Sequence, residues 1–364
     1  MGKFTEIRAL LHDRKNMQAF EEASRWLQAD PQGREPRLIT GYCLKNLCEE
    51  AADKADPDMF IRYYSMLPSL CLQELGQDMM PNRFAWAIDK MARSLAPGSD
   101  IQVKAMTVIL DMARRYSYVK PEKYYSVLLD AAIRVKEKME KGWTGFYDFM
   151  LWWGFDSFSL DDYKKVESSS GHKTPSLAER AHTACYHSLL MQLERKQCHL
   201  DRIKDFVAHL DSLIAGRKAF PDTALHKARL LLAIGEKERA LNAARLFARF
   251  KQADFRTWDV IGDCMDDPVL RLACYCRALK CRSNPGFTVN IRLKAADLMG
   301  NLGLYPNARH EADMVKAIYD SSGWKVKGIL KKIMDSDWFD DTIPADNNES
   351  LYSFYFPYAE QILK

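Results

Sequence analysis

Glycine and proline are both sparse in this sequence. The 364 residues include only 17 glycines and 14 prolines, and these are the residues that interrupt helices most strongly. No stretch alternates apolar and polar β-branched residues in the way that a half-buried strand does. Alanine, leucine, lysine, arginine, glutamate and methionine, which favour helices, predominate instead. The composition therefore argues against a sheet and predicts an all-α protein.

Long hydrophobic runs and a strong charge of one sign are also missing. The net charge is +4, which neither requires nor excludes a nucleic-acid partner in a chain of this length. The most apolar patch, residues 149–155, is far too short to span a bilayer. The first residues carry charges throughout and lack the apolar core of a signal peptide. We therefore expect a cytoplasmic protein that has no membrane partner.

No Cys-x-x-Cys pair occurs, although the chain has nine cysteines. Four of them, Cys264, Cys274, Cys276 and Cys281, gather in residues 258–285. On a helix, Cys274 and Cys276 would point about 200° apart, so they could not both bind one metal ion. We expect these cysteines to be reduced and buried as small hydrophobic residues, and we expect neither a metal nor a cofactor.

Motifs of catalytic sites are missing as well. Residues 171–174, Gly-His-Lys-Thr, lack the partner glycine and the preceding strand of a phosphate-binding loop. The acidic run at 335–341 lacks the central glycine and the closing glutamate of a calcium-binding EF-hand loop. Neither a His-Glu-x-x-His motif nor a nucleophile elbow is present. The sequence therefore favours a protein that is not an enzyme.

What the sequence does contain is an internal repeat in its C-terminal half. Gly235 and Gly303 each begin a Gly-x4-Ala pattern, and they lie 68 positions apart, which is twice 34. Between them, residues 258–262, Trp-Asp-Val-Ile-Gly, resemble the Trp-x2-Leu-Gly pattern of a tetratricopeptide first helix. The glycines mark tight turns between antiparallel helices, and the alanines mark their close approach. One such pair cannot bury its apolar face alone, so neighbouring pairs must stack.

This register sets the predicted domain organisation. A tetratricopeptide-like repeat domain is predicted at 177–364, and its clearest units are 222–255, 256–288 and 289–321. Residues 1–165 also have the pattern of successive helices but hold no 34-residue register, so they are predicted to form an irregular α-solenoid. The Ser-rich segment 166–176 is the predicted boundary, and the alternative is a mobile loop within one solenoid. The predicted fold is an α–α superhelix of antiparallel helix pairs.

The leading functional hypothesis follows from the repeats. Tetratricopeptide arrays usually bind peptides on a concave face lined by the first helix of each unit, and the register places seven polar residues there: Arg229, Arg256, Asp259, Asp263, Asn290, Lys294 and Asp297. The carboxylate-clamp subclass expects Lys and Asn where this chain has Leu225 and Arg229, so that clamp is not supported. We therefore predict a non-enzymatic scaffold that binds a protein partner of another kind.

The alternative hypothesis is binding of single-stranded RNA. Basic residues and tyrosines interleave in residues 113–125, and a second basic group follows the first repeat turn; the candidate residues are Arg114, Arg115, Tyr118, Lys120, Lys123, Arg245 and Arg249. Cations can neutralise phosphates while tyrosines stack on bases. The same pattern is also typical of a solvated helix end, and the sequence alone does not separate the two.

Residues 146–163 are unusually aromatic. Eight of these eighteen residues are Phe, Tyr or Trp. We interpret the block as a packing cluster, with a groove for an aromatic partner and a platform for bases as the alternatives. Basic residues are few within it, so base stacking would lack its electrostatic complement.

Two segments resemble an uncharacterised bacterial family. They are Trp-Trp-Gly-Phe at 152–155 with Asp-Asp-Tyr at 161–163 and Pro-Ser-Leu-Ala-Glu-Arg-Ala at 175–181, and the tail at 347–360. The resemblance implies tetratricopeptide-like helices and a connection with bacterial conflict or defence gene neighbourhoods. Some members of that family carry a cold-shock or S1-like OB domain after these helices, and we expect no such domain within these 364 residues.

Overall fold

The chain is helical almost throughout. A computed structural model describes residues 2–76, 80–96, 100–139, 143–167, 171, 173–325, 328–340 and 347–363. Over these residues it contains 18 α-helices that pack mainly on their neighbours in chain order, so the predicted all-α, solenoid-like fold is confirmed. None of the described helices has the length and apolarity needed to cross a membrane. The chain divides into two compact units, Met1–Gln197 and Cys198–Lys364.

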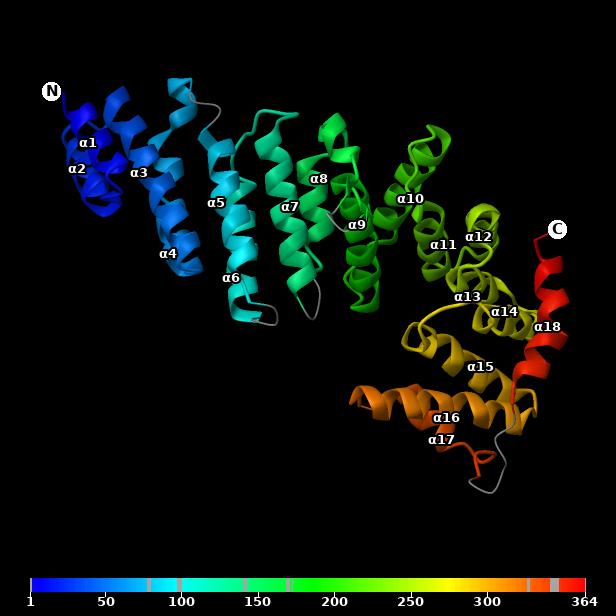
Figure 1. The fold of residues 1–364 in the computed structure, drawn as a ribbon. Coiled ribbons are helices and arrows are strands. Elements are labelled where there is room, and N and C mark those ends of the chain that lie inside the picture. The colour runs from blue at the N-terminus through cyan, green and yellow to red at the C-terminus, as the bar shows by residue number, and fades with distance from the viewer. Residues whose placement is uncertain are drawn as a thin grey trace. The chain divides into compact units, whose positions relative to one another are not determined.

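The first unit holds nine of these helices, which Figure 1 shows following one another in chain order. They are α1 (Lys3–His12), α2 (Asn16–Ala29), α3 (Arg34–Asp53), α4 (Pro57–Tyr64), α5 (Met80–Ser94), α6 (Asp100–Ala113), α7 (Lys123–Lys138), α8 (Phe146–Trp153) and α9 (Leu177–Glu194). Each helix contacts the next one or the one after it, and α3, α5, α7 and α9 form a continuous series of neighbours. This is the packing expected of stacked helix pairs.

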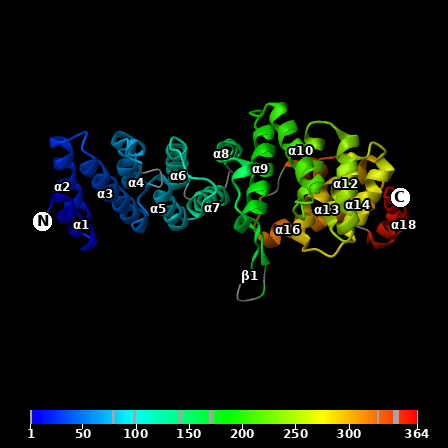
Figure 2. The same ribbon diagram turned by 90° about the horizontal axis from the view of Figure 1, so that it is seen from above.

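A short hairpin interrupts the helices of the first unit. Strands β1 (Val166–Glu167) and β2 (Lys173–Thr174) pair antiparallel, with Val166 opposite Thr174; β1 is labelled in Figure 2. This small sheet was not predicted, because two-residue strands are too short to carry an alternating pattern. The predicted boundary segment 166–176 therefore contains a hairpin within the first unit. His172, which belongs to the predicted segment 171–174, lies outside the described residues.

The aromatic block at 146–163 forms much of the core of the first unit. Trp153 is fully buried and stacks on Tyr125 of α7, with ring centroids 4.9 Å apart and ring planes 4° from parallel. The Trp153 ring N–H donates to the Tyr125 carbonyl at 3.1 Å, and the Tyr125 hydroxyl donates to the Trp153 carbonyl at 2.8 Å. Phe146, Phe149 and Trp143 pack beside them. The packing interpretation of this block agrees with the structure.

The second unit contains the other helices. They are α10 (Leu200–Ala215), α11 (Thr223–Ala233), α12 (Lys237–Lys251), α13 (Phe255–Cys264), α14 (Pro268–Leu279), α15 (Val289–Asn301), α16 (Tyr305–Ser322), α17 (Gly328–Met334) and α18 (Glu349–Gln361). Helices α11 to α16 form three helix pairs at the positions predicted for the three repeats. Gly235 and Gly303 adopt φ of +83° and +77° in the turns inside the first and third pairs, where residues other than glycine are strained.

The middle pair depends on one close contact. A Cβ atom on Gly262 of α13 would lie 2.7 Å from the ring of Tyr275 and 3.1 Å from Cβ of Cys274, both on α14. Glycine is therefore the residue that lets these two helices approach. Helix α14 begins at Pro268, and the side chain of Asp267 accepts hydrogen bonds from the next two free backbone N–H groups.

The last helix folds back along the chain. Helix α18 packs against α14, beside which Figure 1 also places it. A buried polar cluster holds its start: the fully buried carboxylate of Glu311 pairs with Arg292 at 2.6 Å and accepts hydrogen bonds from Asn348, at 2.6 Å, and from the Tyr352 hydroxyl. These contacts connect the start of α18 to α15 and α16, in addition to the packing of α18 on α14.

Candidate functional site

Successive first helices of the second unit are joined by a ladder of ion pairs. Arg229 on α11 lies 3.2 Å from Asp259 on α13, and Lys294 on α15 lies 2.8 Å from the other oxygen of Asp259. Lys294 also lies 2.6 Å from Asp263, whose carboxylate accepts a 2.7 Å hydrogen bond from Tyr275. Four of the seven residues predicted for the concave face therefore meet in one network. Tyr275 belongs to it too, although sequence analysis did not select this residue.

The ladder lysine is a charged group held by its partners. Burial alone would lower the pKa of Lys294, but the attraction of Asp259 and Asp263 outweighs burial and raises that pKa above the usual lysine value. A charge this well compensated stabilises the packing of α13 on α15. Lys294 is a poor candidate for binding a partner, because the partner would first have to separate its ammonium group from Asp259 and Asp263.

The guanidinium of Arg256 is likewise paired with carboxylates of the protein itself. Its guanidinium lies 2.6 Å from Asp222, which occupies the equivalent position 34 residues earlier, and 2.7 Å from Asp254. Asp254 also accepts a hydrogen bond from the Arg256 backbone N–H and so caps α13. The hydrogen bonds that Arg256 donates to Asp254 have the largest effect on the pKa of Arg256, and together the two carboxylates raise that pKa despite partial burial. The repeat therefore brings polar residues of successive units into direct contact.

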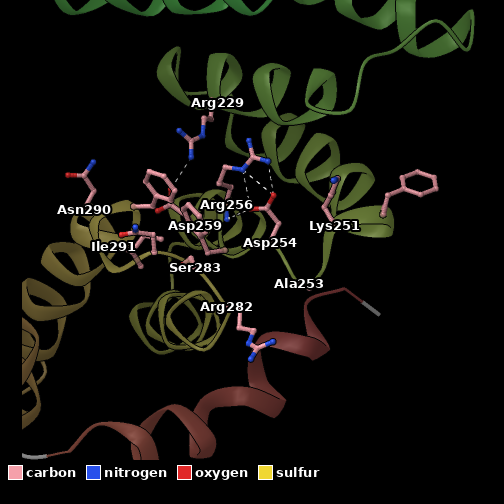
Figure 3. Close-up of a pocket in the computed structure, with 14 residues that line it drawn as sticks. Arg229, Lys251, Ala253, Asp254, Arg256, Asp259, Arg282, Ser283, Asn290 and Ile291 are labelled. Carbon is pink, nitrogen blue, oxygen red and sulfur yellow. Dashed lines mark hydrogen bonds and ion pairs between the residues drawn. The ribbon is translucent and has the colours of Figure 1, made fainter. Parts of the chain in front are cut away.

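A cavity of about 890 Å³ opens beside this network. It is bounded by α11, the end of α12, the start of α13 and the segment from the end of α14 into α15, and it is drawn in Figure 3. Of the predicted residues, Arg229, Arg256, Asp259 and Asn290 line it. Figure 3 shows Arg256 and Asp254 directed at one another and Arg229 directed toward Asp259, while Lys251 and Arg282 lie away from this group.

The cavity adds residues that sequence reasoning missed. Phe250 and Phe287 line it with 82% and 71% of their surfaces exposed, an unusual state for large apolar side chains. Lys251 and Arg282 are also exposed, and within the described part of the chain neither side chain forms an ion pair or hydrogen bond. These residues lie at the end of α12 and just after α14, outside the first-helix register, so the repeat pattern gave no signal for them.

The remaining predicted groove residues have other surroundings. Asp263 and Lys294 belong to the ladder but do not line the cavity. Asp297 lies 3.8 Å from Lys332 of α17 and accepts a hydrogen bond from Asn301. Leu225 stands where the carboxylate clamp expects a lysine, and it is buried in the core.

The candidate RNA-binding residues of the first unit are largely occupied by packing. Tyr118 is buried against Tyr125 and Trp152, so its ring offers no free face to a base. Lys120 lies 4.7 Å above the Tyr125 ring and donates to the Trp153 carbonyl at 3.3 Å. Burial lowers the pKa of Lys120. Arg114 pairs with Asp111 at 3.3 Å, while Arg115 and Lys123 are exposed.

The other part of that predicted face lies in the second unit. Arg245 donates two hydrogen bonds, of 3.1 Å and 3.0 Å, to the Ile362 carbonyl at the end of α18. Arg249 is exposed on α12. Arg245 therefore has a structural contact that a nucleic-acid ligand would have to displace.

The four clustered cysteines are all buried. Burial raises the pKa of Cys264 and Cys274 to about 12, so both thiols are protonated at neutral pH. In the described part of the chain, no group of three or more His, Cys, Asp or Glu side chains is arranged to hold a metal ion. Asp341, the last residue of the acidic run, lies outside the described residues.

Comparison with known protein families gives a match to part of this chain. A family described as a domain of unknown function, DUF7017, matches residues 223–359. That range begins at α11, includes all three helix pairs and the cavity, and ends within α18. The comparison with curated proteins gives no match.

Proposed function

We propose that this protein is a tetratricopeptide-like interaction module, not an enzyme, and that it holds a protein partner at the cavity beside α11, α13 and α15. One observation carries the proposal. Four of the seven residues selected from the repeat register line a single cavity, together with two highly exposed phenylalanines. Exposed aromatic side chains beside polar groups are typical of protein-binding sites.

The distribution of charges supports this function over a catalytic one. The carboxylates that line the cavity, Asp254 and Asp259, are both paired with arginine. General acid–base catalysis needs a group that can exchange a proton near neutral pH. Burial alone would raise the pKa of Asp254, but its hydrogen bonds with Arg256 outweigh burial and lower that pKa below the usual aspartate value. The cavity therefore offers contacts rather than reactive groups. The resemblance described above supports a finer proposal, a cytoplasmic protein of a bacterial defence or stress-response assembly.

The test is affinity purification from the native cell with three versions of the full chain. The first is wild type. The second, the cavity variant, combines Phe287→Ala with Arg282→Glu. The third, a matched control, combines Phe354→Ala with Lys218→Glu, which changes an exposed aromatic residue and an exposed cation elsewhere in the second unit. Circular dichroism and thermal melting establish that all three fold alike.

We expect mass spectrometry to identify a protein that wild type and control retain and that the cavity variant loses. Retention of the same proteins by all three versions would place the interaction elsewhere and defeat the proposal. Co-purification of RNA that is lost only from the cavity variant would favour nucleic-acid binding at this cavity instead.

A further inference from the structure

The exposed aromatic surface of the second unit continues past the cavity. Phe287 lies in the 3₁₀ turn Pro285–Thr288 that precedes α15. A Cβ atom built on Gly286 of that turn would lie 4.0 Å from the Trp324 ring at the end of α16. Trp324 is 52% exposed. Phe250, Phe287 and Trp324 thus supply aromatic surface at the cavity and next to it, and the Trp324 ring lies outside the lining itself.

The charges that remain free at the cavity are positive. Its four lining cations are Arg229, Arg256, Lys251 and Arg282, and its two lining carboxylates are Asp254 and Asp259. Each carboxylate is paired with one of the first two arginines. Lys251 and Arg282 are left to attract a ligand, and both are exposed at the edge of the aromatic surface. A ligand that complements them carries negative charge.

Amide groups at the cavity match a peptide backbone. Asn290 is exposed and lines the cavity. Asn284 uses its side-chain oxygen to accept a hydrogen bond from the Gly286 N–H at 2.9 Å, and its NH₂ group remains a potential donor. An asparagine amide both donates and accepts, as a peptide bond does, so such groups can hold an extended chain without reading its side chains.

We propose that the cavity binds an extended acidic segment of a partner protein that carries an aromatic side chain. The inference rests on the proposed function and specifies its ligand. Carboxylates of the segment pair with Lys251 and Arg282, its main chain bonds to Asn290, and its aromatic side chain packs on Phe287, with Trp324 contacting the residues that follow. A polyanion such as RNA fits less well, because Lys251 and Arg282 are the two lining cations without an ion pair among the described residues, and two carboxylates line the same cavity.

The test measures binding of short labelled peptides to the full chain by fluorescence anisotropy. Three nine-residue peptides are compared: aspartate and glutamate around a central phenylalanine, the same peptide with a central alanine, and lysines around a central phenylalanine. A nine-nucleotide oligouridine is the fourth probe. We expect the acidic phenylalanine peptide to bind most tightly and its affinity to fall as salt increases. The central alanine, or Arg282→Glu in the protein, should each weaken it about tenfold.

Trp324 provides a second readout that does not depend on affinity alone. The acidic phenylalanine peptide should change the tryptophan emission of the wild-type protein. Trp324→Phe should remove that change, while Trp86→Phe, at a residue 41% exposed in the first unit, should keep it. A change in emission that survives Trp324→Phe would contradict the predicted path of the segment.

The outcomes separate this inference from the proposed function. Equal or tighter binding of the lysine peptide, or no binding of any peptide, overturns the proposal that the ligand is an acidic segment. In either case, capture of a partner protein that depends on the cavity still supports the proposed function. Tighter binding of oligouridine overturns the ligand and, with capture of RNA, the proposed function as well. Failure of the capture experiment alone removes the proposed function whatever the peptides do.

Discussion

Both units of this protein place lysine or arginine beside aromatic rings, but the rings lie in opposite environments. In the first unit, Lys120 covers Tyr125, and the rings around it are buried against one another. In the second, Phe250 and Phe287 are exposed and line a cavity together with the exposed Lys251 and Arg282. The rings of Tyr125 and Trp153 pack between α7 and α8, whereas Phe250 near the end of α12 and Phe287 in a 3₁₀ turn keep most of their surface exposed. Position within the helix stack, not residue type, decides whether such a cluster stabilises or binds.

The two units also share a way of connecting alternate helices. In the first, Arg134 of α7 lies 3.5 Å from Asp89 of α5, and Arg180 of α9 lies 2.6 Å from Asp130 of α7. In the second, the ladder of Arg229, Asp259, Lys294 and Asp263 connects α11, α13 and α15. A cavity lined by exposed aromatic residues lies beside the second ladder. The scaffold of the second unit therefore leaves room for a ligand.

The largest difference between the two units should appear in the free energy of unfolding when one aromatic residue is removed from each. Trp153→Ala should lower the free energy of unfolding by about 4 kcal/mol, because it deletes a fully buried ring and the hydrogen bond that the ring donates. Phe287→Ala should change it by less than about 0.5 kcal/mol, because that ring is exposed. Urea denaturation followed by circular dichroism measures both. Comparable losses would mean that Phe287 is a structural residue.

The next largest effect should come from the buried cluster that holds α18. Glu311→Gln removes the charge that pairs with Arg292 and replaces one acceptor with a donor beside Asn348. We expect a loss of about 2–3 kcal/mol, because hydrogen bonds to a buried charged group are lost. Thermal melting measures the loss, and Glu349→Gln at an exposed position of α18 is the control. Stability unchanged in both variants would show that α18 does not depend on this cluster.

A smaller effect should follow from breaking each ladder once. Lys294→Met in the second unit and Arg180→Met in the first both remove a partly exposed cation that joins two helices. Each should cost about 1 kcal/mol, since solvent screens such pairs. Equal costs would support the view that the ladders play the same structural role. A much larger cost for Lys294→Met would indicate that the ladder of the second unit organises its helices to a greater extent.

The smallest expected effect is in the pKa values of two lysines, which should shift in opposite directions from the usual lysine value. Burial lowers the pKa of Lys120, while Asp259 and Asp263 outweigh burial and raise the pKa of Lys294. The stabilisation that Lys294 contributes is therefore present below its unfolded pKa and lost as pH rises through its folded pKa. For Lys120 the burial penalty disappears as pH rises through its lowered pKa. NMR titration of the lysine side chains, assigned with Lys120→Arg and Lys294→Arg, should give midpoints on either side of about 10.4. Midpoints in the reverse order would contradict the contrast.

The repeated part of the fold was predictable because its rules are local. Gly235, Gly303 and Pro268 fix turns and helix starts, and the spacing of 34 then positions the three pairs. The same spacing selected Arg229, Asp259, Asp263 and Lys294, which do meet in space. The spacing could not show that these side chains neutralise one another. The pairs Arg229–Asp259 and Lys294–Asp263 join different repeats, and they form only when the repeats stack.

Other features depended on contacts that no local pattern records. The packing of α18 on α14 joins segments far apart in the chain through residues such as Tyr352 and Asn348. Phe250 and Phe287 are ordinary apolar residues in the sequence, and only the packed structure leaves them exposed. Likewise, Tyr118 looked available beside basic residues, but tertiary packing buries it.

The return of α18 to the middle of the second unit has a mechanical consequence. In a simple repeat array, a pull on the C-terminal end would detach the last repeat first and then each earlier repeat in turn. Here the load would pass from α18 to its contacts with α14, to the Arg245 bond at Ile362 and to the Glu311 cluster, all of which would be stretched together. Extension from that end should therefore meet one large resistance rather than a series of small ones.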